Sequence, residues 1–394
     1  MTLHWGQAYI NKCIPPDLQA RVNEVNCDPF YGDQDLTLPH YNGKTGEKIF
    51  AMPGERPVRI SRRKLRNLLS EGLDIHVWGE KKILAYIRFL LTLHIQQYGK
   101  KCTSVSLTPH AAGVTATFAD GSSASGSFLV GCDSANSVVR EFLVGKEKAK
   151  VEDLDINMFN VSCAYPAEIS KLLRTKHPIF KNSYHPELGM MYWLSIMDVK
   201  DPDRPETWLH QSVVSWIGAP RVEDLPDQAS RTAFFRERAA QFAEPWRSAG
   251  TKFPENLSFG IDRTTVWDPS EGWSDSDLYG RVTLAGDSAH AMPPHRGQGL
   301  NNGLNDAAVL VEQLEAVKQG KKSLKEAVEA YEEDMRERTV KEIPISVAQA
   351  RMVHSWETLM SAPFIKLGMH KQAEAEAEAL EKAKKDEDDN VEAT

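Results

Sequence analysis

The sequence predicts a mixed fold, α/β with α+β character, in which two domains are interleaved along the chain. An apolar run followed by a Gly-Asp pair, a Gly-rich loop and a helix (residues 281–310) is typical of an open α/β sheet. Three strand-like runs within residues 151–220 fit an antiparallel sheet. Residues 305–340 have strong helical patterning.

These patterns divide the chain into parts. We expect residues 1–150 and 260–320 to form one interleaved domain, and residues 151–259 to form a second domain on the antiparallel sheet. Residues 321–370 are expected to be C-terminal helices. Residues 371–394 lack aromatic side chains and end in an acidic run, so a solvated, charged tail is expected there.

The composition limits the possible partners and compartments. The 394 residues include 47 Lys and Arg against 55 Asp and Glu, and the net charge of −8 argues against nucleic acid as a partner. Five cysteines without CxxC spacing indicate a reducing compartment and no zinc site. The longest apolar stretch, Ile83–Ile95, is too short to span a bilayer and contains Arg88. We therefore expect a cytoplasmic protein with no signal peptide and no integral membrane segment.

Local signals place further helices and strands along the chain. Residues 4–25 predict a helix broken at Pro15-Pro16 and then a second helix. Residues 61–72 predict a short amphipathic helix with Ser61 as its N-cap and Gly72 as its stop. Residues 101–133 alternate as a hairpin does and end in a buried strand. Residues 222–249 predict an amphipathic helix or a pair of helices.

The stretch from Arg281 to Leu310 contains the strongest functional signal. Its buried strand ends in Gly286 and Asp287, and Gly allows the backbone to turn or to approach a ligand closely. An acidic residue at the carboxyl end of such a strand suits a ribose hydroxyl. A dinucleotide-type ligand is therefore expected at this turn.

The loop that follows has features that suit an anionic group. Pro293-Pro294 form a rigid corner, Gly297 and Gly299 lie in an exposed loop, and a helix opens near Leu300–Asn301. The free amides of that helix can stabilise negative charge, such as develops on the N1–C2=O edge of a reduced flavin. The alternative is a tight turn in which the glycines are purely structural. Contact with a ligand, however, would explain each element of this ordered series.

This series closely resembles the second flavin motif of class A FAD-dependent monooxygenases, the para-hydroxybenzoate hydroxylase-like family. The family pattern runs from Gly-Asp-x-Ala-His-x-x-x-Pro into Gly-Gln-Gly-x-Asn and then a helix with Asp-Ala. The matching residues here are Gly286, Asp287, Ala289, His290, Pro293, Pro294, Gly297, Gln298, Gly299, Asn301, Asp306 and Ala307.

Two further motifs agree with this resemblance. The segment "GCDSANSVVR" resembles the Asp-Gly motif of the family, with matches at Asp133, Ser137, Val139 and Arg140. Ser134 stands where the family has Gly, which affects how closely the backbone can approach a cofactor. The segment "RRKLRNLL" resembles the Arg-x-x-Leu helix of the family, whose arginine faces the FAD, and this register selects Arg62.

The resemblance covers residues 1–340 and implies both a fold and a chemistry. The interleaved domain would be a Rossmann-like domain of the FAD/NAD(P)-binding type, and residues 151–259 would bind the substrate. FAD would be the cofactor and NAD(P)H the co-substrate, and one atom of O₂ would hydroxylate or epoxidise an aromatic or polyketide-like small molecule. The motifs resemble those of fungal secondary-metabolite biosynthesis. The implied cofactor-binding residues are Arg62, Asp133, Arg140, Gly286, Asp287, Pro294, Gly297, Gly299, Leu300 and Asn301.

Other residues have more open roles, and no general base is identified. His290 is expected to be structural because it follows the ribose-binding turn, whereas His295 and Arg296 are candidates for the active-site wall. The aromatic residues of the predicted sheet could cover a substrate, with core packing as the alternative for each. These residues are Tyr192, Trp193 and Trp208.

Two features depart from a complete family member. No GxGxxG occurs anywhere in the sequence, so we expect a Rossmann-like domain truncated at its N-terminus, with weakened FAD binding. The segments "WGEKK" and "YGKK" look like two copies of one strand entry, so Trp78–Gln96 is expected to be an insertion. A genuine lineage-specific helix is the alternative.

Two other functions stay open. The missing GxGxxG favours a non-catalytic remnant that binds no FAD and contacts another protein through an exposed sheet edge. A different flavoenzyme reaction on the same scaffold, such as dehydrogenation or ring cleavage, is also compatible, because function lies in the site and not in the fold. The sequence does not indicate the oligomeric state.

Overall fold

The computed structural model describes residues 2–3, 5–32, 37–52, 58–71, 74–77, 95–97, 99–108, 113–273, 280–363 and 365–367. The chain forms two compact units. Unit 1 consists of Met1–Asn26, Ile60–Asp155 and Arg263–Ala350. Unit 2 consists of Cys27–Arg59, Ile156–Asp262 and Arg351–Thr394.

These units interleave in sequence, but their limits differ from the expected domain boundaries. Residues 27–59 were expected in the first domain and lie in unit 2, because strands from this segment join its large sheet. The C-terminal helices are divided between the units at Ala350. The assignment of the ranges to cofactor and substrate stays a prediction.

The strands of unit 1 form small sheets. Strands β10 and β16 pair in parallel, with Gly131 opposite Leu284, as expected for neighbouring strands of an α/β sheet. The expected hairpin is present as the antiparallel sheet β7-β8-β9, and β5 and β6 form a second parallel pair. The strands are β1 (Thr2–Leu3), β5 (Asp74–Val77), β6 (Ile95–Gln97), β7 (Cys102–Leu107), β8 (Val114–Phe118), β9 (Ser123–Gly126), β10 (Leu129–Gly131) and β16 (Val282–Leu284).

The helices of unit 1 agree with several local predictions. Ser61 caps α3, because its hydroxyl accepts the Lys64 amide at 3.4 Å, and the break at Pro15-Pro16 separates α1 from α2. Gly72 lies outside the described residues. The helices are α1 (Gln7–Cys13), α2 (Pro16–Gln19), α3 (Arg62–Ser70), α4 (Val138–Val144), α8 (Asp287–His290), α9 (Gly299–Lys318) and α10 (Leu324–Met352), with 3₁₀ turns η1 (Val22–Val25) and η5 (Pro294–Arg296).

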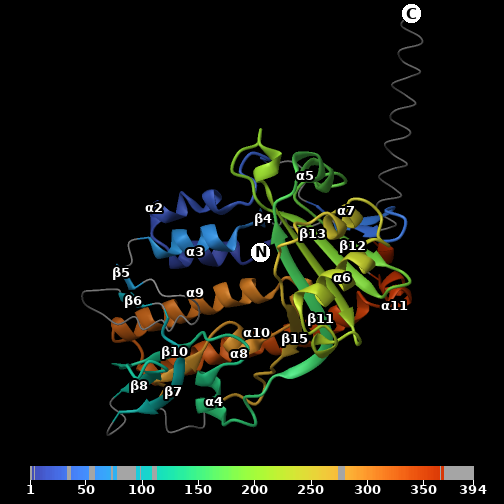
Figure 1. Ribbon diagram of the computed structural model, residues 1–394. Coiled ribbons are helices and arrows are strands. Elements are labelled where there is room, and N and C mark those ends of the chain that lie inside the picture. The colour runs from blue at the N-terminus through green and yellow to red at the C-terminus, as the bar shows by residue number, and fades with distance from the viewer. Residues whose placement is uncertain are drawn as a thin grey trace, which may run out of the picture. The chain divides into compact units, whose positions relative to one another are not determined.

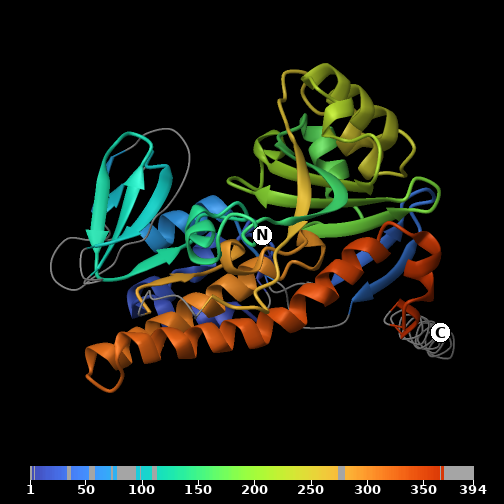
Figure 2. The same ribbon diagram turned by 90° about the horizontal axis from the view of Figure 1, so that it is seen from below.

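The helical stretch expected at residues 305–340 consists of two helices, α9 and α10. The chain breaks at residues 319–323, where Gly320 has a φ of +69° that favours glycine. Helices α9 and α10 then run side by side as a hairpin, which both views show in orange and red (Figures 1 and 2). This hairpin brings residues after 330 back to the beginning of α9.

Unit 2 is built on a seven-stranded sheet. The strand order is β15-β11-β14-β13-β12-β2-β3. The expected antiparallel strands are present, but β12 pairs with β2 in parallel, so the sheet is mixed. The strands of this sheet are β2 (Leu38–Asn42), β3 (Lys48–Met52), β11 (Glu152–Cys163), β12 (Phe180–His185), β13 (Met190–Asp198), β14 (Leu209–Ile217) and β15 (Ile261–Val266). Strand β4 (Val58–Arg59) is not part of it.

Helices cover the large sheet of unit 2. Helices α6 and α7 form the pair expected at residues 222–249, and they pack on the face that presents Phe159 and Tyr192 (Figure 1). Helix α11 contributes Leu359 to a cluster with Phe50 and Tyr184. The helices are α5 (Ala167–Leu173), α6 (Gln228–Ala239), α7 (Trp246–Thr251) and α11 (Trp356–Ser361), with 3₁₀ turns η3 (Pro205–Thr207) and η4 (Val222–Asp224).

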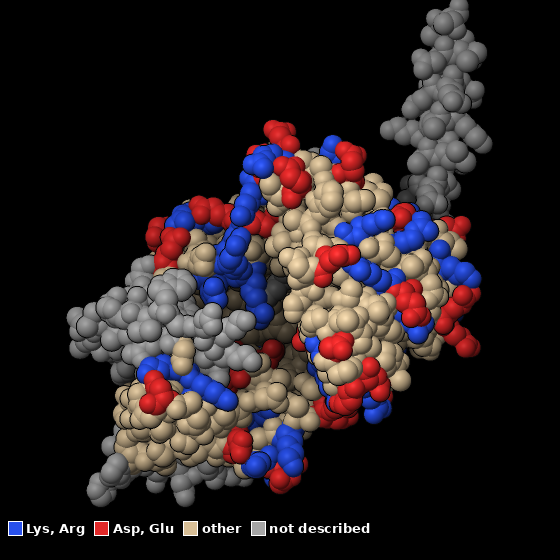
Figure 3. All heavy atoms as spheres, in the orientation of Figure 1, with Lys and Arg blue, Asp and Glu red and all other residues tan. Residues whose placement is uncertain are grey.

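Several other expectations concern the surface and the segments outside the described residues. In the described ranges, no helix combines the length and hydrophobicity that crossing a membrane requires. None of the five cysteines, all of which are described, forms a disulfide. Acidic and basic side chains are intermixed on the face shown in Figure 3. The proposed insertion lies outside the described residues, apart from its last two residues in β6, and so does the tail.

Candidate functional site

Two acidic residues follow neighbouring strands of unit 1. Strands β10 and β16 run in the same direction, and the Ala285 amide extends their ladder by donating to the Gly131 carbonyl at 2.9 Å. Asp133 and Asp287 follow these strands directly. Because the carboxyl ends of parallel strands meet at one edge, the two predicted motifs come together there.

The Gly-Asp turn depends on a backbone shape that favours glycine. Gly286 has a φ of +63°, and its amide donates to the Asp306 carboxylate at 2.8 Å. The short helix α8 begins at Asp287 and ends at His290. His290 is fully buried and lies 2.6 Å from the same carboxylate oxygen through Nε2, in line with the structural role expected for it.

Asp306 is the centre of a buried charged cluster. Its side chain is 0% exposed, and Arg338 of α10 donates to its second oxygen at 2.7 Å. Burial alone would raise the pKa of Asp306, but His290 and Arg338 outweigh it and lower the pKa. The carboxylate is therefore held in its charged form between the turn, α8 and α10.

The beginning of α9 offers free backbone donors. Helix α9 spans 20 residues, has no side-chain hydrogen bond at its N-cap and no acidic residue in its first turn. Gly297 precedes it with a φ of +69°. The Asp287 carboxylate is close, since a Cβ placed on Gly299 would lie 3.6 Å from its Oδ1 atom. Asp287 is exposed and forms no hydrogen bond or ion pair with the described residues.

This donor set fits the ribityl and flavin end of FAD. An exposed carboxylate suits a sugar hydroxyl, and an uncapped helix N-terminus suits the electron-rich N1–C2=O edge of a flavin. The exposed Pro294 and half-buried Leu300 lie on either side of the glycine loop. The structure thus brings together Gly286, Asp287, Pro294, Gly297, Gly299 and Leu300 on one segment.

Asn301 has a different environment from its neighbours. It is 0% exposed, its Oδ1 accepts the Gly6 amide at 3.1 Å, and its Nδ2 donates to the Gly297 carbonyl at 2.9 Å. A Cβ on Gly6 would lie only 2.6 Å from Oδ1, so this close approach requires glycine. The side chain of Asn301 therefore fixes the glycine loop and the residues before α1.

Asp133 organises the Asp-Gly motif. Its carboxylate accepts the Val138 amide at 2.7 Å at the N-terminus of α4, and it accepts the Ser288 hydroxyl at 3.1 Å. Ser134, which replaces the glycine of the family pattern, has a φ of +74°. The backbone thus keeps the shape that favours glycine, although a side chain is present.

Arg140 is buried among carbonyl groups. It is 1% exposed, donates to the Ala149 and Ser288 carbonyls at 2.8 and 2.9 Å, and lies 4.7 Å over the Trp267 ring. Burial lowers its pKa to about 10, although Asp133 opposes this shift. This placement favours an indirect role through Ser288.

The remaining predicted residues lie on α3 and in η5. Arg62 is exposed at the first position of α3 and forms no ion pair with the described residues. His295 and Arg296 are half-buried in η5, and Arg296 donates to the Glu342 carboxylate of α10 at 2.8 Å. Arg296 is therefore held by an ion pair at the edge of the glycine loop.

The three aromatic residues of the sheet divide into two kinds. Tyr192 is 0% exposed, packs toward α6 and α7, and bonds Ser212 at 3.0 Å. Trp208 is 8% exposed and donates to the Asp201 carbonyl at 2.7 Å. Trp193 alternates with Tyr192 along β13, is half-buried, and has the Arg59 guanidinium 5.6 Å from its ring centre. Core packing thus explains Tyr192 and Trp208.

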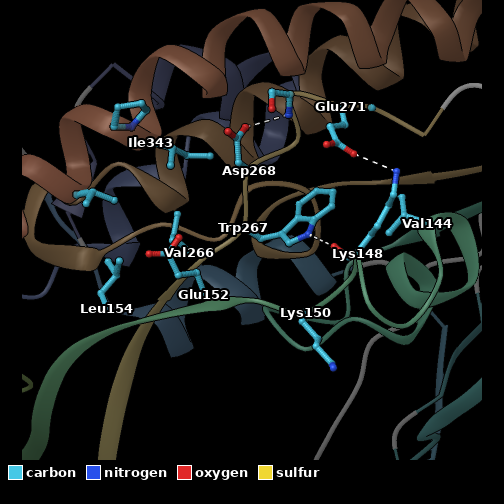
Figure 4. Close-up of a pocket in the computed structure, with 14 residues that line it drawn as sticks. Val144, Lys148, Lys150, Glu152, Leu154, Val266, Trp267, Asp268, Glu271 and Ile343 are labelled. Carbon is cyan, nitrogen blue, oxygen red and sulfur yellow. Dashed lines mark hydrogen bonds and ion pairs between the residues drawn. The ribbon is translucent and has the colours of Figure 1, made fainter.

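A cavity of about 520 Å³ also lies in unit 1. Figure 4 shows Trp267 in its wall, with the indole N–H donating to the Lys148 carbonyl at 2.8 Å. The lining residues are Val144, Lys148, Lys150, Glu152, Leu154, Val266, Trp267, Asp268, Ser270, Glu271, Gly272, Ile343, Pro344 and Val347. None of the predicted cofactor residues lines it, so we do not assign the cofactor to this cavity.

Sequence reasoning missed Ser288 and Arg338, and it matched Asp306 to the flavin motif without assigning it a role. Ser288 links the two motifs, Asp306 holds the turn, and Arg338 neutralises Asp306. No local signal identifies the role of Arg338, because Asp306 and Asn302 lie 32 and 36 positions earlier in the chain.

Comparisons with known proteins identify the family of this chain. The family described as "FAD binding domain" matches residues 67–343. The chain is 31% identical over 376 residues to FAD-dependent monooxygenase phnB of Penicillium herquei, covering 93% of this chain and 84% of that protein. It is 33% identical over 368 residues to FAD-dependent monooxygenase cctM of Talaromyces islandicus, covering 93% and 85%.

A solved structure has a similar fold. Klebsiella pneumoniae HpxO, complexed with FAD and uric acid, matches with a TM-score of 0.68 and 19% sequence identity. The match covers 94% of this chain and 83% of that chain. At this identity the likeness concerns the fold alone.

Proposed function

The chain belongs to the FAD-binding-domain family of FAD-dependent monooxygenases, and from this membership we propose that it hydroxylates or epoxidises an aromatic or polyketide-like small molecule. NAD(P)H would supply the electrons and O₂ the oxygen atom. The product would belong to secondary-metabolite biosynthesis, as the resemblance to fungal family members implies. The observation that supports this best is the exposed Asp287 carboxylate beside the uncapped N-terminus of α9.

Each residue near that edge has a definable task in this proposal. When bound, FAD would take electrons from NAD(P)H and activate O₂ for the transfer of one oxygen atom. Asp287 would hold a sugar hydroxyl, and the first amides of α9 would stabilise negative charge at the flavin edge. Asp133 and Arg140 would keep Ser288 and the turn in place, and Arg62 would contact the cofactor from α3.

We place the aromatic substrate against Trp193 on the sheet of unit 2. Of the three aromatic residues, Trp193 is the one that is half-buried. Several polar side chains of unit 2 also form hydrogen bonds with one another. Arg59 donates to the Ser195 hydroxyl at 3.0 Å, and Gln211 donates to the Asn160 amide oxygen at 2.7 Å. A planar ring surface beside fixed polar side chains suits an aromatic ligand with hydroxyl groups. HpxO, which has a similar fold, binds uric acid, a small planar ligand.

The first test is the visible absorption spectrum of the purified protein supplied with FAD. Retained flavin bands, followed by substrate-dependent NAD(P)H oxidation and a product heavier by one oxygen atom, would establish the proposed reaction. A protein that stays colourless with FAD in excess would contradict the proposal for this chain and favour the non-catalytic alternative. Reduction of bound flavin without an oxygenated product, across a panel of phenols and naphthols, would favour a different flavoenzyme reaction.

The role of Trp193 has its own test. Replacing Trp193 by Ala should raise the substrate KM about tenfold, since the ring would lose its stacking partner. Tyr192→Phe is the matched control, because Tyr192 lies on the opposite face and should leave KM unchanged. An unchanged KM in Trp193→Ala would place the substrate elsewhere.

A further inference from the structure

Helix α10 contacts the cofactor segment at regular intervals. Tyr331 donates its hydroxyl to the Leu284 carbonyl at 2.7 Å, at the end of β16. Arg338, two turns later, contacts Asp306, and Glu342, one turn further, accepts from Arg296 at 2.8 Å. Residues spaced by three, four or seven positions lie on one face of a helix, so a single face of α10 contacts the strand, the turn and the glycine loop.

Arg338 connects this face to both halves of the site. One Nη atom donates to the Asp306 carboxylate at 2.7 Å, and the other donates to the Asn302 side-chain oxygen at 2.5 Å. Asn302 in turn donates to the Gln298 carbonyl at 3.0 Å, in the loop before α9. The planar guanidinium thus joins the Gly286 turn, through Asp306, to the glycine loop, through Asn302.

The burial of Asp306 makes this connection sensitive to Arg338. Asp306 is 0% exposed, whereas the Arg338 side chain is 19% exposed. If Arg338 were removed, the buried carboxylate would keep the Gly286 amide and His290 as its partners among the described residues. A buried carboxylate with too little compensation moves toward solvent or takes up a proton, and either change alters the acceptor that holds the Gly286 amide.

We infer that Arg338 is a positioning residue of the flavin-binding turn, and that it acts through Asp306. It contacts neither substrate nor cofactor in this role. It fixes the direction of the Asp287 carboxylate relative to the first amides of α9, since Asp287 follows the Gly286 amide that Asp306 holds. The inference rests on the proposed function for its link to FAD, but the position of the turn can be measured without FAD.

The test compares Arg338→Ala, Arg338→Lys and the control Lys341→Ala in the full chain. Lys341 lies on the solvent side of the same helix, is 71% exposed and pairs only with Glu337 among the described residues. Two quantities are measured. The first is hydrogen–deuterium exchange of peptides spanning residues 284–292 in the flavin-free protein, and the second is the Kd for FAD by flavin fluorescence.

We expect Arg338→Ala to speed exchange at the Gly286 turn and to raise the Kd for FAD, each about tenfold. Guanidinium ion at low, non-denaturing concentration should restore both values, because it refills the site of the lost group. Arg338→Lys should show a smaller effect, since an ammonium cannot bridge Asp306 and Asn302 as a planar fork does. Lys341→Ala should match the wild type.

Unchanged exchange at the turn in a folded Arg338→Ala variant would overturn the inference. If that variant does not fold, unchanged exchange in Arg338→Lys would overturn it equally. Faster exchange with an unchanged Kd for FAD would also contradict it, because the turn would then not govern cofactor binding. A wild-type protein that takes up no FAD would contradict the proposed function alone, and exchange at the turn would still decide whether Arg338 positions it.

Discussion

Different kinds of interaction stabilise the interiors of the two units. In unit 2, Phe159 is 0% exposed and packs with its ring centre 4.9 Å from Trp216 and 5.1 Å from Phe259. In unit 1, Asp306 is equally buried but makes directional contacts of 2.6 to 2.8 Å with three donors. Dispersion contacts are many and tolerant of small shifts, whereas charged hydrogen bonds are few and strict in geometry. We therefore expect the aromatic cluster to determine the free energy of unfolding and the Asp306 cluster to determine the position of the Gly286 turn.

The largest expected effect tests the aromatic side of this comparison. Phe159→Ala should lower the free energy of unfolding by about 3–5 kcal/mol, because it removes a fully buried ring and leaves a cavity. Chemical denaturation measures this loss. The Kd for FAD of the fraction that remains folded should be unchanged. A changed Kd at full folding would show that the two roles are not separate.

The second prediction uses pH to separate the clusters. The folded-state pKa of Asp306 is lowered, so its stabilisation is present above the ordinary aspartate pKa of about 3.9 and is lost as pH falls through the lowered value. Asp306→Asn should cost about 3 kcal/mol at neutral pH, and its stability should fall less steeply than that of the wild type below about pH 4. Phe159→Ala should keep the wild-type slope. Unfolding measured at several pH values checks both, and equal slopes in all three proteins would refute the assignment.

A smaller effect on stability is expected at the exposed carboxylate. Asp287→Ala should change the free energy of unfolding by less than about 0.5 kcal/mol, because the side chain has no described partner. It should raise the Kd for FAD roughly tenfold, as expected for the loss of one charged hydrogen bond. Asp268→Ala, at another exposed acid of unit 1, is the control. If both variants bind FAD as the wild type does, Asp287 is not a cofactor ligand.

The last prediction concerns the strained backbone next to Asp133 and involves stability alone. Ser134→Gly should stabilise the protein by up to about 1 kcal/mol, because glycine adopts the positive φ without a Cβ penalty. Ala135→Gly should be destabilising, since its neighbouring position has no such strain to relieve. Thermal unfolding of the two variants compares them directly. A lower midpoint for Ser134→Gly than for the wild type would contradict the strain.

The local parts of the candidate site could be predicted from the sequence. The strand, the Gly286 turn, the glycine loop and the helix follow one another along 20 residues, and each has a residue type that its backbone shape requires. The same holds for Ser134, where the motif itself indicated a glycine-like position. Such features depend on residues that are close in the sequence, so the local sequence pattern predicts them.

The parts that were missed depend on partners distant in sequence. Arg338 looks like any other charged residue of a solvated helix, and only the fold brings it to Asp306. The parallel pairing of β12 with β2 has the same cause, since the paired residues Asn182 and His40 are 142 positions apart in the chain. No periodicity within either segment indicates which strand it will meet.

The hairpin of α9 and α10 also determines when the site can be completed during synthesis of the chain. The group that completes the Gly286 turn emerges 52 residues after it during synthesis, from position 286 to position 338. At the usual rate of about 5–20 residues per second, this delay is roughly 3–10 s. A nascent chain that ends before α10 would contain the glycine loop but not Arg338, the residue that holds it in position. Stable binding of the cofactor then occurs late in synthesis. A messenger truncated before codon 338 would yield a protein that binds flavin weakly, although every proposed flavin-binding residue is present.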